Sequence, residues 1–199
     1  RDLHLSIRRQ RQMCIRDSYE SRYKLLTMKF INFKLILSIL LLSSINAFAV
    51  MDVVHLGSFG KSGAWQAKEF KDGTSKICYI ISKPIATNPS DLNRGEHALM
   101  ITNFQDDGTS HEASVDTGFT FKPKSMVEVS INNSNYKFFT VESRAWLADG
   151  ENDKKLIKDM KNGARVKVKS ISSRGTKITD TYSLIGFTKA LAAIDEACS

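Results

Sequence analysis

Hydrophobic and polar side chains alternate along most of the chain beyond residue 64. In the segment 126–131, three β-branched aliphatic residues face one side while Glu128 and Ser130 face the other, which is the period of a half-buried strand. Runs of β-branched and aromatic residues between turn-forming residues predict further strands at 65–70, 77–82, 97–104, 111–117, 136–141, 165–171 and 177–184. Many short strands joined by short turns are typical of a mainly β, antiparallel sandwich or barrel-like domain.

Two segments have a helical period instead. Between 151 and 161, three apolar residues fall on one side and lysines fall on the other, so we expect a short helix with one buried face. Asp149 or Asn152 is expected to cap its N-terminus. Apolar residues recur every three or four positions at 187–197, which predicts a C-terminal amphipathic helix.

Residues 28–49 contain the three parts of a secretory signal peptide. A positively charged start precedes an apolar run from 35 to 45, and the segment ends with Ala47, Phe48 and Ala49. The apolar run is far shorter than the ~20 residues that a membrane-spanning helix needs, so a transmembrane anchor is the less favoured interpretation. We expect cleavage after Ala49, a periplasmic or secreted protein, and no membrane span after cleavage.

The remaining chain divides around this segment. Residues 1–27 are interpreted as a non-native or disordered leader, with a basic arm that binds nucleic acid as the alternative. We expect a single domain at 50–199. Its first part, 50–63, contains several Gly and Ser residues and is expected to be a loosely held lead-in.

Charge is distributed unevenly along the chain. The net charge is +8, but residues 1–49 hold nine basic and three acidic residues, so residues 50–199 are only weakly basic. This distribution argues against the basic footprint of a DNA- or RNA-binding protein. Nine basic residues nevertheless lie within 154–177, against the single acidic residue Asp159.

This basic segment is a candidate interaction patch. If its helix and strand share one surface, the patch suits anionic envelope lipids, lipopolysaccharide or an acidic protein surface. No aromatic residues are interleaved for base stacking, which disfavours nucleic acid. A solvated face that only aids solubility is the alternative. The candidate residues are Lys154, Lys158, Lys161, Lys167, Lys169 and Arg174.

Two cysteines remain beyond residue 49, Cys78 and Cys198. An even pair in an exported protein favours a disulfide, because compartments outside the cytoplasm are oxidising. Two unrelated buried thiols are the alternative. A Cys78–Cys198 bond would tie the end of the chain to an early strand.

Catalytic and metal-binding patterns are weak. The sequence has no G-x-S-x-G nucleophile motif, and His55, His97 and His111 are scattered without cysteine partners at metal-ligand spacing. The acidic run 149–153 lacks the glycine and the second acid that a calcium loop needs. We expect no metal, no cofactor and a non-enzymatic binding or envelope-interaction module. A small-ligand carrier or a hydrolytic enzyme of envelope components is the alternative, and the oligomeric state is left open.

A set of aromatic, glycine and cysteine positions follows a characteristic order between Trp65 and Cys198. The set comprises Trp65, 78–84, Gly118, Phe119, Phe121, Ala145, Trp146, 173–176, Asp180, 182–184, Gly186, Phe187, Ala190, Leu191 and Cys198. In this order they resemble the invasion-associated locus B family of exported alphaproteobacterial proteins. The resemblance implies a small, mostly β periplasmic or envelope protein with its two cysteines bridged and no catalytic residues. The family is named for a role in host-cell invasion.

The same residues carry structural expectations. Gly175 is expected to form a turn with positive φ, and Gly186 is expected to permit the change from strand to helix. Arg174 is expected to pair with Asp180 across the last hairpin, with presentation to a partner as the alternative. Large core contacts are expected from Trp65, Trp146 and Phe187.

Overall fold

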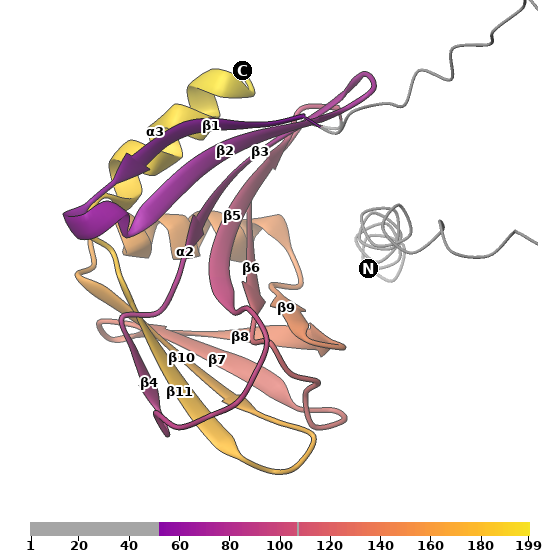
Figure 1. Ribbon diagram of the computed structural model, residues 1–199, viewed down its shortest axis with the longest axis vertical. Coiled ribbons are helices and arrows are strands. Elements are labelled where there is room, and N and C mark those ends of the chain that lie inside the picture. Colours follow the sequence, from indigo (N-terminus) through magenta and orange to yellow (C-terminus); the bar gives the residue numbers. More distant parts are fainter. Residues whose placement is uncertain (1–51, 107) are drawn as a thin grey trace, which may run out of the picture. The chain divides into compact units, whose positions relative to one another are not determined.

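The computed structural model describes residues 52–106 and 108–199 of the chain (Figure 1). The predicted leader at 1–27 and the predicted signal peptide at 28–49 lie outside the described residues and stay predictions. The described elements are, in order, β1 (Asp52–Phe59), the 3-10 helix η1 (Lys61–Gly63), β2 (Trp65–Asp72), β3 (Ser75–Ser82), β4 (Ala86–Asn88), β5 (Ala98–Phe104), β6 (Thr109–Asp116), β7 (Met126–Ile131), β8 (Ser134–Val141), β9 (Arg144–Trp146), α2 (Gly150–Lys161), β10 (Arg165–Ile171), β11 (Lys177–Ser183) and α3 (Phe187–Ala197).

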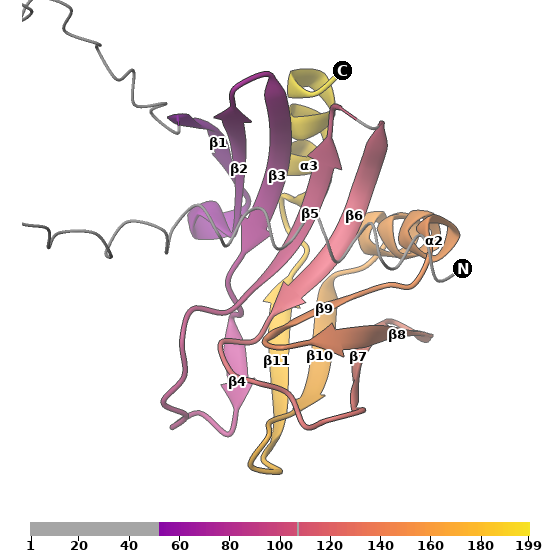
Figure 2. The same ribbon diagram turned by 90° about the vertical axis from the view of Figure 1, so that its right-hand side faces the viewer.

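The eleven described strands form one sheet with the order β1-β2-β3-β5-β6-β9-β8-β7-β10-β11-β4. Each neighbouring pair is antiparallel, and β4 leaves the first half of the sheet to pair with β11 at the far edge. In Figure 2, β8 and β9 cross the direction of β3, β5 and β6, so the sheet bends between its two halves. The predicted mainly β, antiparallel class with two helices is confirmed, and its strands form one continuous bent sheet.

The two faces of the sheet have different surroundings. One face packs against α3, which contacts β1, β2 and β3, and against α2, which contacts β6 and β8. Figure 2 shows α3 behind strands β3 and β5, and α2 beside β6. Side chains of this face and of both helices form one hydrophobic cluster, in which the rings of Trp65 and Phe187 meet edge to face at 5.1 Å. We name the opposite side the helix-free face, because neither α2 nor α3 packs on it.

The first strand corrects the prediction of a loose lead-in at 50–63. Residues 52–59 form β1, which pairs with β2 along its length, with a register shift between His55 and Gly57. The glycines and serines that suggested a loop are accommodated at this irregularity and at the strand end. Main-chain hydrogen bonds to a long neighbouring strand therefore outweigh the low strand propensity of this composition.

Both helices begin as the sequence predicts. Asp149 caps α2, because its Oδ1 accepts a hydrogen bond from the backbone N of Asn152 at 2.9 Å. Gly186 precedes α3 with a φ of 91°, and a Cβ at this position would lie 2.3 Å from the backbone N of Gly60. Only glycine fits that approach. In the described part of the chain, neither helix has the length and apolar character required to cross a bilayer.

Candidate functional site

The C-terminal helix is fastened to the sheet at its last turn. Cys78 of β3 and Cys198, directly after α3, form a disulfide with Cα atoms 6.0 Å apart. Lys76 Nζ also donates to the carbonyl oxygen of Ala197. The predicted disulfide is therefore present, and it fits an extracytoplasmic location, since such bonds persist in oxidising compartments.

A second fastening joins α3 to the hairpin of β5 and β6. Asp195 Oδ1 accepts a hydrogen bond from Asn103 Nδ2 at 2.9 Å and lies 2.7 Å from His111 Nε2. Asn103 Oδ1 in turn accepts from the backbone N of His111 at 2.8 Å. These bonds support His111 at a φ of 61°. His111 therefore helps to hold α3 against the sheet.

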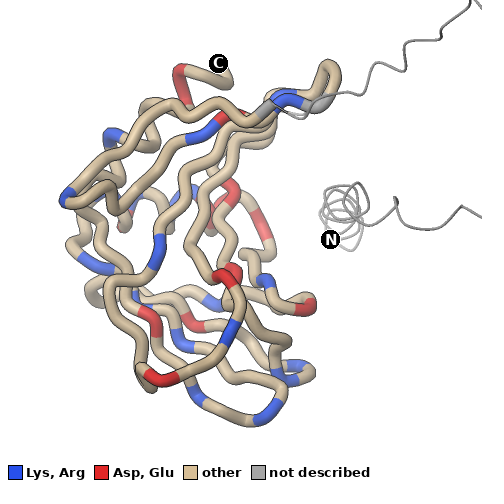
Figure 3. Tube along the Cα trace, in the orientation of Figure 1, with Lys and Arg blue, Asp and Glu red and all other residues tan. Residues whose placement is uncertain are grey.

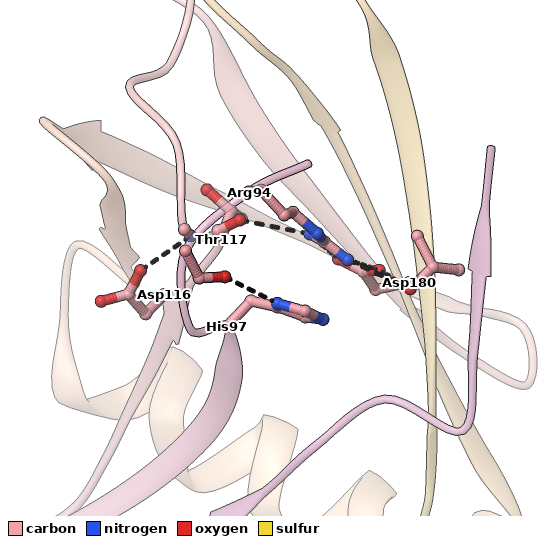
Figure 4. Close-up of polar contacts among 8 residues, drawn as sticks. Arg94, His97, Asp116, Thr117 and Asp180 are labelled. Atoms are coloured by element: carbon pink, nitrogen blue, oxygen red, sulfur yellow. Dashed lines mark hydrogen bonds and ion pairs between the residues drawn. The ribbon is translucent and has the colours of Figure 1, made fainter. Parts of the chain in front are cut away.

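Arg94 and Asp180 form a bidentate ion pair whose charged groups are buried (Figure 4). Arg94 Nη2 lies 2.5 Å from Asp180 Oδ1, and Nη1 donates to Oδ2 at 2.8 Å. The side chains are 4% and 0% exposed, respectively. Thr87 Oγ1 of β4 donates a third hydrogen bond to Asp180 at 2.7 Å. A buried charge is tolerated when it is paired with an opposite charge and hydrogen-bonded in this way.

Arg94 also joins two loops at one end of the sheet. Its Nη1 donates to the carbonyl oxygen of Thr117 at 3.2 Å, and its guanidinium lies 6.0 Å from the ring centroid of Phe119. Beside it, the backbone N of Gly95 donates to the carbonyl oxygen of Gly118 at 2.9 Å. The pair therefore ties the 89–97 segment both to β11 and to the segment that follows β6.

This cluster corrects the predicted partner of Asp180. Arg174 is exposed in the turn between β10 and β11, where Gly175 has the predicted positive φ, 86°. Asp180 faces the core instead, directly across from Val168. An arginine at the exposed tip of the hairpin does not reach that interior position, so Arg94 of a distant loop occupies it.

Tyr182 lies two residues from Asp180 on the same face of β11, and its buried hydroxyl has no hydrogen-bond partner among the described residues. Burial, and next the nearby charge of Asp180, raise the pKa of this phenol. Removing an unsatisfied buried hydroxyl removes its desolvation cost. We expect Tyr182→Phe to leave the free energy of unfolding unchanged or to raise it by up to about 1 kcal/mol. Urea unfolding measures this, and a loss above that size would reveal a partner for the hydroxyl.

The structure separates the predicted basic patch into two groups. The lysines of α2 lie on its solvent side, where Lys154 pairs with Glu151 at 2.8 Å. The helix packs on the core face of β8, where Tyr136 Oη donates to Asp159 Oδ2 at 2.5 Å. This hydrogen bond lowers the pKa of the Asp159 carboxyl. Val168 also belongs to the core. Its neighbours Lys167 and Lys169 therefore point to the helix-free face, away from the helix lysines.

The strand lysines belong to a larger cluster that the sequence did not reveal. On the helix-free side of the neighbouring strands β8, β7, β10 and β11, five exposed basic side chains lie on β8, β10 and β11, and we name them the basic face. Its cross-strand pairs place Glu128 of β7 between Lys137 and Lys169. Figure 3 shows basic positions recurring along these strands. The basic face comprises Lys137, Arg165, Lys167, Lys169 and Lys177.

The basic face is not neutralised by nearby acids. In the described residues, no ion pair joins any of its members to a carboxylate, and Glu128 is the one acidic residue on the helix-free side of β7, β8, β10 and β11. Lys137 was missed because it stands alone in the sequence, and only strand pairing places it beside Lys169 across Glu128. A surface of this charge attracts anions.

The helix-free face also carries no arrangement of metal ligands. Across residues 52–106 and 108–199, no group of three or more His, Cys, Asp or Glu side chains is placed to hold a metal ion. His55 contacts Ser58 Oγ at 3.1 Å, and His97 Nδ1 lies 3.0 Å from the carbonyl oxygen of Gly95. The described histidines thus make separate contacts, His111 with Asp195 of α3.

Comparison with known proteins agrees with this architecture. A model of the invasion associated locus B (IalB) protein family matches residues 65–195. Among solved structures, the crystal structure of invasion associated protein B from Bartonella henselae aligns with a TM-score of 0.51 and 14% identity, over 72% of this chain and 97% of that chain. At this identity the likeness shows a shared fold. A search of curated proteins gives no match. Because the family model covers well over half of the sequence, the chain belongs to the invasion associated locus B family.

Proposed function

We propose that this protein is exported by a cleavable signal peptide at 28–49 and acts in the cell envelope as a non-enzymatic binding module. Its basic face contacts an anionic lipid surface. The observation that carries the proposal is the set of five exposed basic side chains on one sheet face with the single acid Glu128 among them. The Cys78–Cys198 disulfide supports the compartment.

The expected interaction is electrostatic and additive over several weak contacts. A basic residue held near an anionic membrane contributes about 1 kcal/mol, so the five members of the basic face supply on the order of 5 kcal/mol at low ionic strength. Salt screens such contacts beyond ~10 Å at 0.1 M. Binding by this surface therefore weakens as the salt concentration rises.

A role in host-cell invasion belongs to the same proposal. The aligned Bartonella protein is named as invasion associated, and a host membrane with anionic lipids presents the same chemistry to the basic face. The function at the envelope does not depend on contact with a host. Both settings require a membrane with negative surface charge.

Vesicle binding tests the proposal directly. We expect the purified protein to co-sediment with phosphatidylglycerol-containing vesicles and not with neutral phosphatidylcholine vesicles. A triple variant of the basic face, Lys137→Gln, Lys167→Gln and Lys169→Gln, is expected to weaken binding roughly 100-fold at low salt, because three contacts of about 1 kcal/mol each are lost.

The helix lysines supply a control with the same change in net charge. The triple variant Lys154→Gln, Lys158→Gln and Lys161→Gln alters the group on the other side of the sheet, so we expect less than a threefold loss. Equal losses in the two triple variants would show that net charge alone drives binding. Equal binding to anionic and neutral vesicles would overturn the proposed function.

A further inference from the structure

Each basic residue of β10 is paired with a hydroxyl residue of β11. The two strands are antiparallel neighbours (Figure 1), and directly opposite residues point to the same face of a sheet. Because Val166 and Val168 are buried in the core, the basic residues that alternate with them lie on the helix-free face together with their partners. We name these three pairs the cation–hydroxyl ladder. Its rungs are Arg165–Ser183, Lys167–Thr181 and Lys169–Thr179.

The ladder is accessible along its whole length. Its three basic side chains are exposed, and its three hydroxyl side chains are half-buried. In the described part of the chain, no hydrogen bond uses the hydroxyl of Thr179 or Thr181. Ser183 Oγ accepts a hydrogen bond from the backbone N of Ile185 at 3.2 Å, which leaves its own proton to be donated. Each rung therefore presents a cation and an O–H donor to a ligand.

A rung of this composition suits a phosphate group. Phosphate is negatively charged and has several acceptor oxygens, so it can take a charge-assisted hydrogen bond from the cation and a second bond from the hydroxyl. Lys167 has a hydroxyl residue on each side, because it pairs with Thr181 of β11 and with Ser130 of β7. Glu128 pairs with Lys169, so its carboxylate opposes an anion mainly at that end of the ladder.

The rungs repeat at a regular spacing. Alternate residues of an antiparallel strand lie about 6.8 Å apart, so the three rungs extend over about 14 Å along β10. A head group with one phosphate fills one rung. A head group with two or more phosphates can fill neighbouring rungs, and its second contact is then intramolecular, which raises the affinity. The ladder therefore favours several phosphates on one molecule over the same charge on separate molecules.

We infer that the cation–hydroxyl ladder recognises lipid head groups that carry two or more phosphate groups, with one phosphate on each occupied rung. This inference rests on the proposed function and adds the class of lipid that is selected. The other members of the basic face, Lys137 and Lys177, attract any anionic membrane. The paired hydroxyls add hydrogen bonds that general electrostatic attraction does not need, and they make the surface selective.

Vesicles of matched phosphate content test the inference. The probes are phosphatidylcholine vesicles that contain diphosphoryl lipid A, a disaccharide lipid with two phosphates, or twice the mole fraction of monophosphoryl lipid A, which has one. We expect at least tenfold tighter binding to the diphosphoryl vesicles in co-sedimentation, because only that lipid can fill two rungs at once. Equal affinity for the two kinds of vesicle overturns the inference.

Variants without the hydroxyls provide a second arm at unchanged net charge. In the double variant Thr179→Val and Thr181→Val, the branched side-chain shape is kept. We expect its preference for diphosphoryl vesicles to fall below threefold, while its binding to phosphatidylglycerol vesicles stays within twofold of the unmodified protein. The double variant Thr179→Ser and Thr181→Ser keeps both hydroxyls and is expected to keep the preference. A preference that survives the loss of both hydroxyls contradicts the inference.

A matched control lies on the other side of the sheet. Thr188 is exposed on α3, and Thr188→Val is expected to change neither kind of binding. Circular dichroism and urea unfolding verify that each variant folds, and Thr181→Val alone replaces the double valine variant where it does not.

The outcomes separate the inference from the proposed function. Binding that follows the charge of the vesicles alone overturns the inference and leaves the proposed function standing, whereas no binding to any anionic vesicle overturns both. Inorganic tripolyphosphate is the soluble probe in isothermal titration. If it binds as tightly as the diphosphoryl vesicles, the ladder binds a soluble polyanion and the inference of a lipid ligand is wrong.

Discussion

Replacing Arg94 by methionine is expected to lower the free energy of unfolding by about 3–5 kcal/mol. The Asp180 side chain is fully buried, so the variant leaves a carboxylate in the interior with only the hydroxyl of Thr87 as a remaining side-chain donor among the described contacts. Breaking a buried pair by removing one partner is costly because the other charge stays desolvated. Urea unfolding followed by circular dichroism measures the loss.

Two further variants sharpen this prediction. The matched control Arg174→Met alters the exposed turn arginine, for which a change within about 0.5 kcal/mol is expected. The double variant Arg94→Met and Asp180→Leu is expected to recover much of the single loss, because apolar replacements of buried ion pairs are often neutral. The prediction would be wrong if Arg94→Met stayed within 1 kcal/mol of the unmodified protein, or if Arg174→Met lost as much.

The strands and helices that could be predicted from the sequence are those long enough to show a regular alternation of apolar and polar residues. Strands such as β7 and β10 alternate over six or seven residues, and each alternation places one set of side chains in the core. β4 and β9 contain three residues each, too few to show a period of two. β1 was hidden by its glycines and serines, because its stability comes from pairing with β2.

The candidate site was less predictable because it depends on contacts between distant segments. Arg94 and Asp180 are 86 residues apart, and the loop around Arg94 has no local pattern that identifies a partner. Alternation in β10 correctly separates Lys167 from Val168. It does not show which face α2 covers, so the helix and strand lysines were grouped together. That information lies in the packing of Tyr136 against Asp159.

Loss of the Cys78–Cys198 disulfide is expected to lower the free energy of unfolding by about 2–5 kcal/mol. The two residues are 120 positions apart, and in the chain-entropy model closure of a loop of that size removes about 4–5 kcal/mol of unfolded-state entropy. Urea unfolding with and without dithiothreitol measures the loss. The variant Cys198→Ser should show the same loss without reductant and no further response to it, which separates the bond from general effects of the reagent.

The position of the disulfide also predicts where the native state is affected. α3 remains attached to the core by Phe187, Leu191 and Ile194, which are buried. The reduced protein is therefore expected to keep amide exchange protection in the first turns of α3 and to lose it near Ala197, where Lys76 and the disulfide hold the last turn. Loss of protection throughout α3 on reduction would contradict this, because it would mean that the bond, and not the apolar face, holds the helix on the sheet.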